Sequence, residues 1–547
     1  MSLSERPMKL LESEFKRMNK EDALHTNIVA ASLMAELIRT SFGPFGLDKM
    51  IIDPLGDIII TNDGSTIVKN FDVRHPVARI LDNLVRSQDY EAGDGTKTAV
   101  ILTGELLKQA FHLLENKIHP NDIISGYEIA LKWVNELLDK NAIKVDINDK
   151  QILRNLVLTA LNSKFQVDNE EYLADLVVDA VMTVLEKDHK GDHFVNLKNI
   201  FVLAIKGGNI RDSRLVRGMV IDKEILSGLM PKRIENAKIA MVEPSLEPKK
   251  VHEFKPKISI IRPDQMKIFR NEDLNILKKF INKMKETGVN VAFFRRDISE
   301  KAQSFLNQAG IIAARFVHRD QFYATQKAIG ANLITKLDDY SEKDLGHAKL
   351  VEERKVGKKK VIFIEDCKNP KAVCILLRAG IKNVGYELER RIMDALSVVK
   401  NAVEEKKILA GGGAIEIELS RKIKFKSNTM HGKKQLAINA FADSLEIIPK
   451  TLIETAGLDI IDMLANLRAA HNLQNDDSRF IGLNTNTFSL DNMIKAGIID
   501  SYRAKYHAIN AASEVAKLIL RIDDIIDQAE ESAYAPPPKP REPIEDD

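Results

Sequence analysis

The order in which helix-like and strand-like segments follow one another constrains this chain most. Apolar residues recur at helical spacing over residues 22–41, and further helices are predicted after Pro76, near Thr96 and over 122–140. Short β-rich runs follow at 201–205, 237–242, 289–294, 313–317, 332–334 and 360–364. Long helical segments return at 384–405, 435–456 and 501–529. This order predicts a multidomain α and α/β fold, in which a helical domain made from both chain ends brackets an inserted α/β unit.

Composition excludes several classes of protein. The 547 residues include 81 Lys+Arg and 79 Asp+Glu, a net charge of +2, which argues against a dedicated nucleic-acid binder. No apolar run is long enough to span a membrane, and we expect no signal peptide, because residues 1–20 are charged throughout and lack an apolar core. Two cysteines cannot form a disulfide scaffold, so we expect a cytoplasmic protein. The Pro-rich, polar residues 535–547 are predicted to be a disordered tail.

The segment Gly93-Asp94-Gly95-Thr96-Lys97-Thr98 carries the clearest chemical signal. Its glycines allow a ligand to approach the backbone closely, and the free N–H groups at the start of the next helix favour an anion. Asp94 offers the kind of oxygen ligand that Mg²⁺ prefers. A glycine-rich helix entry with an N-terminal cap explains the same residues without any ligand. The segment lacks the register of a Walker A loop.

Three other segments have both a structural and a functional interpretation. Asn62-Asp63-Gly64 follows a predicted strand at 57–61 and is expected to be a hairpin turn into 66–68, which is also a rigid platform for a carboxylate. Asp394 lies beside an apolar helix face, where it either pairs with Arg390 or acts as a general base for water. The glycines of 410–414 either join two helices or pass under a ligand.

Taken together, several segments in order resemble the group II chaperonins, the archaeal thermosome and eukaryotic TRiC/CCT type, over almost the whole chain. The segments that carry the resemblance are 39–50 (RTSFGPFGLDKM), 60–67 (ITNDGSTI), 91–100 (EAGDGTKTAV), 161–164 (LNSK), 351–354 (VEER), 367–372 (CKNPKA), 411–414 (GGGA) and 520–524 (LRIDD).

The resemblance implies three domains. A mostly helical equatorial ATPase domain would comprise 1–143 and 402–547, and a small α/β intermediate hinge domain would comprise 144–211 and 366–401. An α/β apical domain for substrate binding would span 212–365, with a helical lid protrusion at about 254–285. The implied function is that of an ATP-dependent chaperone subunit that folds unfolded client proteins inside stacked rings of identical or paralogous subunits.

The resemblance also implies roles for individual residues, with ATP/ADP and Mg²⁺ as cofactors. Asp94 matches the Mg²⁺ ligand, and Asp63 and Asp394 match the two carboxylates that position and activate the attacking water. Lys164 resembles the lysine that senses the γ-phosphate. The remaining positions that match the nucleotide site are Gly43, Pro44, Gly95, Thr96, Lys97, Thr98, Gly412, Gly482, Asn484 and Asp500.

The chain departs from the pattern of the family at five positions. It has Lys97 where the family usually has Thr, Phe45 for a basic residue, Ser65 for Ala, Ala379 for Gly and Ser501 for Pro. Lys97 adds a positive charge beside the expected phosphates, which would strengthen nucleotide binding or slow product release. These departures predict a divergent thermosome paralogue that works in a mixed ring. They also leave open a structural ring or filament subunit with weak ATPase activity.

Overall fold

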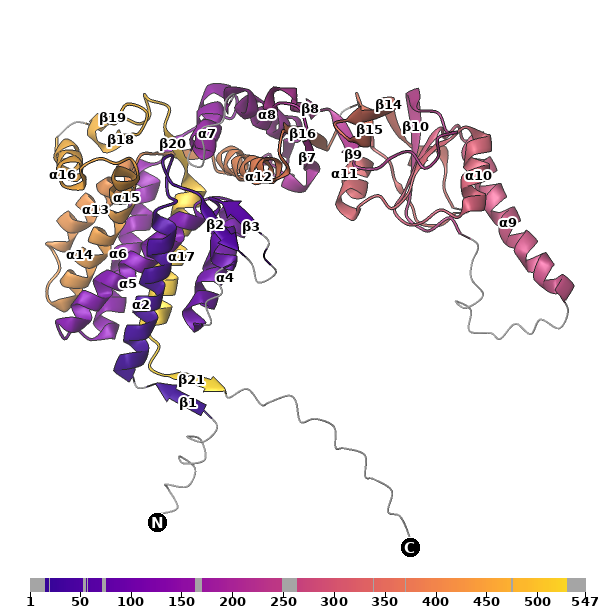
Figure 1. Cartoon of the computed structure of the whole chain (residues 1–547). Coiled ribbons are helices and arrows are strands. Elements are labelled where there is room, and N and C mark those ends of the chain that lie inside the picture. Colours follow the sequence, from indigo (N-terminus) through magenta and orange to yellow (C-terminus); the bar gives the residue numbers. More distant parts are fainter. Residues whose placement is uncertain are drawn as a thin grey trace, which may run out of the picture.

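The computed structural model of the chain contains a helical bundle and two α/β units (Figure 1). It describes residues 15–18, 20–52, 56, 58–70, 75–162, 170–247, 263–337, 339–368, 370–473 and 476–528. Within these ranges the fold is a multidomain α and α/β fold, as the sequence predicts. The domain boundaries given above stay a prediction.

The helical bundle is built from both halves of the chain. The first half supplies α2 (Lys20–Arg39), α3 (Gly64–Lys69), α4 (Pro76–Ala92), α5 (Thr96–Glu115) and α6 (Pro120–Asn141). The second half supplies α13 (Ala414–Ser427), α14 (Lys433–Leu445), α15 (Ile447–Thr455), α16 (Ile460–His471) and α17 (Tyr502–Leu520). Tyr127 and Phe441, both fully buried, join the two halves through an edge-on ring contact with centroids 5.4 Å apart. One hydrophobic core therefore holds distant parts of the chain together.

Short strands form small sheets at the edges of this bundle. The antiparallel pairs are β1 (Phe15–Met18) with β21 (Ile525–Gln528), β2 (Lys49–Ile52) with β3 (Ile58–Thr61), and β18 (Ile481–Asn484) with β19 (Ser489–Asn492). A three-stranded sheet contains β20 (Ile499–Ser501), β17 (Lys407–Ala410) and β4 (Ile143–Lys144), and η5 (Asp476–Phe480) precedes β18.

Three local predictions were wrong. The strand before Asn62 pairs with the preceding β2, and Asp63 caps α3 because its side chain accepts from the backbone N–H of Thr66 at 2.8 Å. The predicted helix 435–456 breaks between α14 and α15, where Pro449 lacks the N–H that would bond to the carbonyl of Leu445. The predicted helix 501–529 ends at Leu520, because the chain then turns to pair β21 with β1.

A buried acid joins α13 to α16 within the bundle. The Glu418 side chain is 2% exposed and contacts His471 Nδ1 at 3.0 Å and the cations of Arg421 and Lys422, each at 2.9 Å. Burial alone would raise the pKa of Glu418, but the hydrogen bonds from His471, Arg421 and Lys422 outweigh burial and lower this pKa to about 2.

A smaller α/β unit lies between the bundle and the larger α/β unit (Figure 1). Its helices are α7 (Lys150–Asn162), α8 (Glu170–Thr183) and α12 (Lys382–Glu405). Its three-stranded sheet has the order β7 (Ile200–Lys206), β16 (Val373–Ala379) and β8 (Arg214–Val216). The unit also contains the separate antiparallel pair β5 (Glu186–Lys187) and β6 (His193–Phe194), together with η1 (Leu197–Asn199) and η2 (Ile210–Asp212). A core of its own packs α12 against α7, α8 and the sheet.

The larger α/β unit contains a seven-stranded mixed sheet. Its strands are β9 (Gly218–Ile221), β10 (Arg233–Val242), β11 (Val291–Phe294), β12 (Ile312–Ala314), β13 (Leu333–Ile334), β14 (Gly346–Val356) and β15 (Lys359–Glu365). Its helices are α9 (Pro263–Glu286), α10 (Glu300–Ala309), α11 (Arg319–Ile329) and η4 (Glu342–Asp344). Helix α9 extends away from the sheet (Figure 1). The predicted protrusion 254–285 therefore includes most of α9, and its part before 263 lies outside the described residues.

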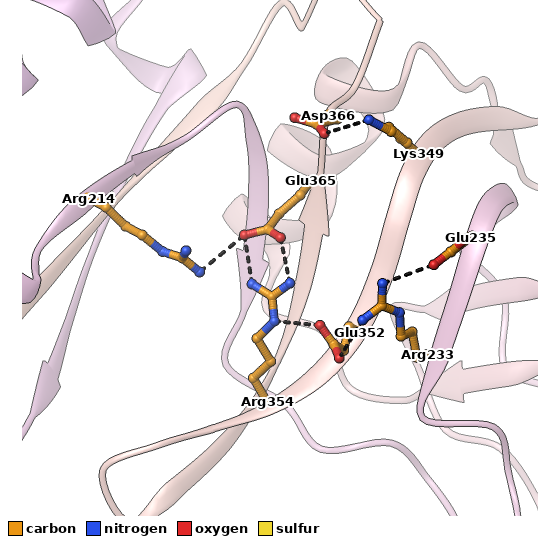
Figure 2. A network of polar contacts seen from close by, with 8 residues as sticks. All are labelled: Arg214, Arg233, Glu235, Lys349, Glu352, Arg354, Glu365 and Asp366. Carbon is orange, nitrogen blue, oxygen red and sulfur yellow. Dashed lines mark hydrogen bonds and ion pairs between the residues drawn. The ribbon is translucent and has the colours of Figure 1, made fainter.

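An ion-pair network joins the two α/β units (Figure 2). Arg354 of β14 binds Glu365 at the end of β15 through two hydrogen bonds of 2.9 and 2.7 Å. Arg214 of β8, in the smaller unit, reaches the same carboxylate at 3.1 Å. Both guanidinium groups also lie over the ring of buried Phe363. Glu365 is thus shared between the two sheets at the point where the chain passes from one to the other.

Within the part of the chain that the structure describes, no helix combines the length and the apolar character needed to cross a bilayer.

Candidate functional site

A pocket of about 140 Å³ lies where the helical bundle meets the smaller α/β unit. Its walls come from the loop after α2, the start of α5, α7, the glycine loop before α13, α15, β18 and the corner between β20 and α17. The predicted site residues that line this pocket are Gly43, Pro44, Asp94, Gly95, Thr96, Lys97, Thr98, Gly412 and Asp500. Segments more than 400 residues apart in the sequence therefore share one cavity.

The start of α5 presents backbone donors to the pocket. Gly95, the N-cap residue, has φ +83° and makes no side-chain capping hydrogen bond, so a ligand can take the place of a cap. Buried Gln88 holds the preceding turn by donating to the carbonyl of Asp94 at 2.6 Å. A twenty-residue helix with its N-terminus at the cavity favours an anionic ligand there.

Fixed charges form part of the opposite wall. Lys505 of α17 bridges Glu416 of α13 and Asp500 of β20, the latter at 3.1 Å. Burial raises the pKa of Asp500, and the negative charges of Glu416 and Asp94 raise it further, against the opposing effect of Lys505. Burial alone would lower the pKa of Lys505, but its two carboxylate partners raise it. Lys505 and its two carboxylate partners therefore fix α13, β20 and α17 relative to one another at the pocket wall.

The Asp63 carboxylate is held rigidly next to this pocket. Its Oδ2 accepts from Ser65 Oγ at 2.5 Å, from Thr66 N at 2.8 Å and from Thr66 Oγ1 at 2.7 Å. The next residue, Gly64, packs on the start of α5 so closely that a Cβ atom there would lie 2.8 Å from Thr96 Oγ1. The cap of α3 therefore fixes Asp63 beside the N-terminus of α5, although Asp63 itself does not line the cavity.

Helix α12 of the smaller α/β unit docks on the loop that carries Asp94. Asn401 donates to the carbonyl of Ala92 at 2.8 Å, and it is buried. One turn earlier, Ser397 packs on Gly93, where a Cβ atom would lie only 2.2 Å from the Cβ of Ser397. Glycine at position 93 thus permits a close approach between α12 and the loop, and its φ of +67° also favours glycine.

The N-terminal half of α12 contacts the end of β3 with the same face of the helix. Glu387 and Arg390 both contact the hydroxyl of Thr61, at 3.4 and 3.5 Å. Asp394 is half-buried and lies on this face between those contacts and Ser397, because residues three or four apart share one side of a helix. The face of α12 therefore bridges the segment of Asp63 and the loop of Asp94, with Asp394 between the two.

Two further predicted residues do not line the cavity. Gly482 and Asn484 belong to β18 but are not among the residues that line the cavity, whose wall is formed by their neighbours Leu483 and Thr485. Asn484 donates instead to Asp491 at 3.0 Å. Lys164 lies outside the described residues.

Sequence reasoning missed Thr159, Thr485 and Lys505, all of which line the cavity. Thr159 and Lys505 are single polar residues on ordinary amphipathic helices, without a glycine or a motif beside them. Lys505 could have been proposed only from its five-residue spacing after Asp500, which places it in the first turn of α17.

Three departures from the chaperonin pattern have a structural account. Ser501 is the N-cap of α17 and accepts from the backbone in its first turn, which suits a helix start as well as Pro does. Ser65 donates to Asp63, as described above. The Phe45 ring contacts that of Phe488 with centroids 5.4 Å apart, so it packs on the β18–β19 turn.

Comparison with known proteins identifies the family. Residues 34–530 match the model of the TCP-1/cpn60 chaperonin family. The chain belongs to this family. This chaperonin is 45% identical over 524 residues to a thermosome subunit of Pyrococcus horikoshii, with 96% of this chain and 94% of the relative covered. It is 43% identical over 525 residues to thermosome subunit beta of Thermococcus kodakarensis, with 96% and 95% covered. The predicted resemblance to group II chaperonins is therefore confirmed.

Proposed function

We propose that this chaperonin is an ATP-dependent molecular chaperone subunit that binds unfolded proteins and folds them in a closed ring cavity, driven by hydrolysis of Mg-ATP. The observation that carries the proposal is the docking of α12 on the site. One face of this helix contacts both Thr61, two residues before Asp63, and the loop of Asp94. These contacts support a site in which Asp63, Asp94 and Asp394, from distant parts of the chain, would act together near the start of α5.

The residues present fit a magnesium-bound triphosphate. The uncapped start of α5 would bind phosphate oxygens, and Asp94 would hold Mg²⁺. The described residues contain no group of three or more His, Cys, Asp or Glu side chains that could hold a metal ion. Mg²⁺ is usually bound through one or two carboxylates together with phosphate oxygens rather than by an all-protein cage. When bound, Mg²⁺ neutralises the charge that develops on the phosphate oxygens.

Asp63 and Asp394 would act on the attacking water. Asp63, fixed by its three hydrogen bonds, would orient the water. Asp394 would accept a proton as the water oxygen bonds to the terminal phosphorus and the bond to the bridging oxygen breaks. Because Asp394 belongs to the smaller α/β unit, turnover would require α12 to stay docked on the bundle, which couples hydrolysis to movement of that unit.

The same proposal assigns roles to the other parts of the chain. Residues 1–143 and 402–547 would form the equatorial ATPase domain, 144–211 and 366–401 the hinge, and 212–365 the apical client-binding domain with α9 in its lid. Partner subunits would be identical or paralogous chaperonins in stacked rings in the cytoplasm. Both cysteines are free and buried, which suits a reducing compartment.

Refolding of a chemically denatured model enzyme by the purified full-length protein, mixed with its paralogues where a ring requires them, tests this function. We expect recovered enzyme activity to depend on ATP and Mg²⁺ and to be lost with a non-hydrolysable ATP analogue. A ring that assembles but shows no ATP-dependent refolding and no ATP turnover would instead establish the structural alternative, a subunit with weak ATPase activity.

A further inference from the structure

The Lys97 side chain does not extend freely into the cavity. It is 7% exposed, and its ammonium donates to the carbonyl of Ser41 at 2.7 Å and to Oδ1 of Asn62. These acceptors belong to two segments that are separate from α5, namely the loop after α2 and the residue that precedes Asp63. The charge that the sequence places beside the expected phosphates is therefore bound by oxygen atoms of the protein itself.

Both neighbours of Asp63 contact Lys97. Asn62 is fully buried, and while its Oδ1 accepts from Lys97 its Nδ2 donates to the carbonyl of Gly46 at 3.0 Å. Gly64 packs against the stem of the lysine, because a Cβ atom there would lie 2.7 Å from Lys97 Cγ. Lys97 thus contacts the residues on both sides of Asp63 and connects them to the loop after α2.

We propose that Lys97 is a positioning residue that fixes Asp63 relative to the start of α5, rather than a ligand of the phosphates. The proposal rests on the ATP hydrolysis proposed above. A threonine at position 97, which the family pattern leads one to expect, is too short to reach Ser41 and Asn62 together. Removal of the ammonium would leave two buried oxygen acceptors without their donor, and the segment could then shift.

Replacement of Lys97 by methionine, which keeps the length of the stem and removes the charge, tests this role. In the assembled ring we expect Lys97→Met to lower the single-turnover hydrolysis rate by at least about 10-fold, while the Kd of a fluorescent ATP analogue changes by less than about 3-fold. Asn62→Leu breaks the same contact from the other side. The double variant should therefore lose little more than either single variant. Lys49→Met is the matched control, because Lys49 donates to Thr40 on the same loop at 2.6 Å but does not contact Asn62 or Gly64.

A parallel fall in ATP affinity and rate in Lys97→Met would overturn the proposal and make Lys97 a phosphate ligand, and an unchanged rate would also overturn it. Backbone hydrogen exchange of residues 58–70 without nucleotide separates this role from the ATPase. We expect faster exchange in Lys97→Met than in wild type or Lys49→Met, and equal exchange would refute the contact even if the wild-type ring proved unable to hydrolyse ATP.

Discussion

Substitution of Gly93 by alanine tests whether the close packing of α12 on the loop of Asp94 controls catalysis. The added Cβ atom would lie 2.2 Å from the Cβ of Ser397, whereas ordinary contact begins at 3.4 Å, so α12 must move by about 1.2 Å. A displacement of about 1 Å at a catalytic group lowers the rate roughly 100-fold. The left-handed backbone at this position, φ +67°, adds about 1 kcal/mol of destabilisation for alanine.

Gly330→Ala is the matched control for this prediction. Gly330 ends α11 with φ +68°, and a Cβ atom there would meet nothing within 4 Å, so only the backbone term applies. We expect Gly330→Ala to keep the kcat of the wild type for ATP and Gly93→Ala to have a roughly 100-fold lower kcat. Adding Ser397→Gly, which removes the opposing atoms, should recover much of this kcat. Equal kcat values for Gly93→Ala and Gly330→Ala would refute the reasoning.

Three further predictions concern charge. The lowered pKa of Glu418 stabilises the fold above about pH 4.5, and roughly 3 kcal/mol is lost as the pH falls toward 2; acid unfolding of Glu418→Gln should lack most of this slope. Arg354→Met should lower the free energy of unfolding, measured in thermal scans, by about 1–3 kcal/mol, because it removes both hydrogen bonds to Glu365. Arg233 is exposed, so the control Arg233→Met should change this free energy by less than about 1 kcal/mol (Figure 2). Chelation of Mg²⁺ should weaken nucleotide binding to wild type but leave Asp94→Asn unaffected in calorimetry.

The helical part of the fold follows from the sequence better than the strands do. Helices such as α4 and α12 have apolar residues at regular helical spacing, and α4 also begins at a proline and ends before a glycine. Strand β14 was missed because Lys349, Glu352, Glu353, Arg354 and Lys355 give it no apolar alternation. Glu352 and Arg354 pair with each other within β14, and Figure 2 shows that they also reach Arg233 of β10 and Glu365 of β15. Only the assembled sheet reveals why these charges are tolerated.

Part of the candidate site could likewise be predicted from the sequence, and part could not. The glycine-rich loops at 93–95 and 411–413 can be identified from the sequence, because closely spaced glycines indicate a backbone that other residues rarely adopt. Both loops contribute residues to the lining of the pocket. The contacts of Lys97 could not be predicted, since Ser41 and Asn62 lie 56 and 35 residues away and approach it only through packing of α5 against two loops. The turn at Asn62–Gly64 was misassigned because the same residue types that form hairpin turns also cap helices.

Single-turnover ATP hydrolysis by the Asp394→Asn variant in an assembled ring tests the central claim most directly. Asparagine keeps the shape of the side chain but cannot accept the proton, so we predict that the Kd for ATP stays within about 3-fold of wild type while the hydrolysis rate falls by about 100-fold or more. Hydrolysis at the wild-type rate by that variant would contradict the account, because the acid that α12 brings to the site would then have no part in the chemistry.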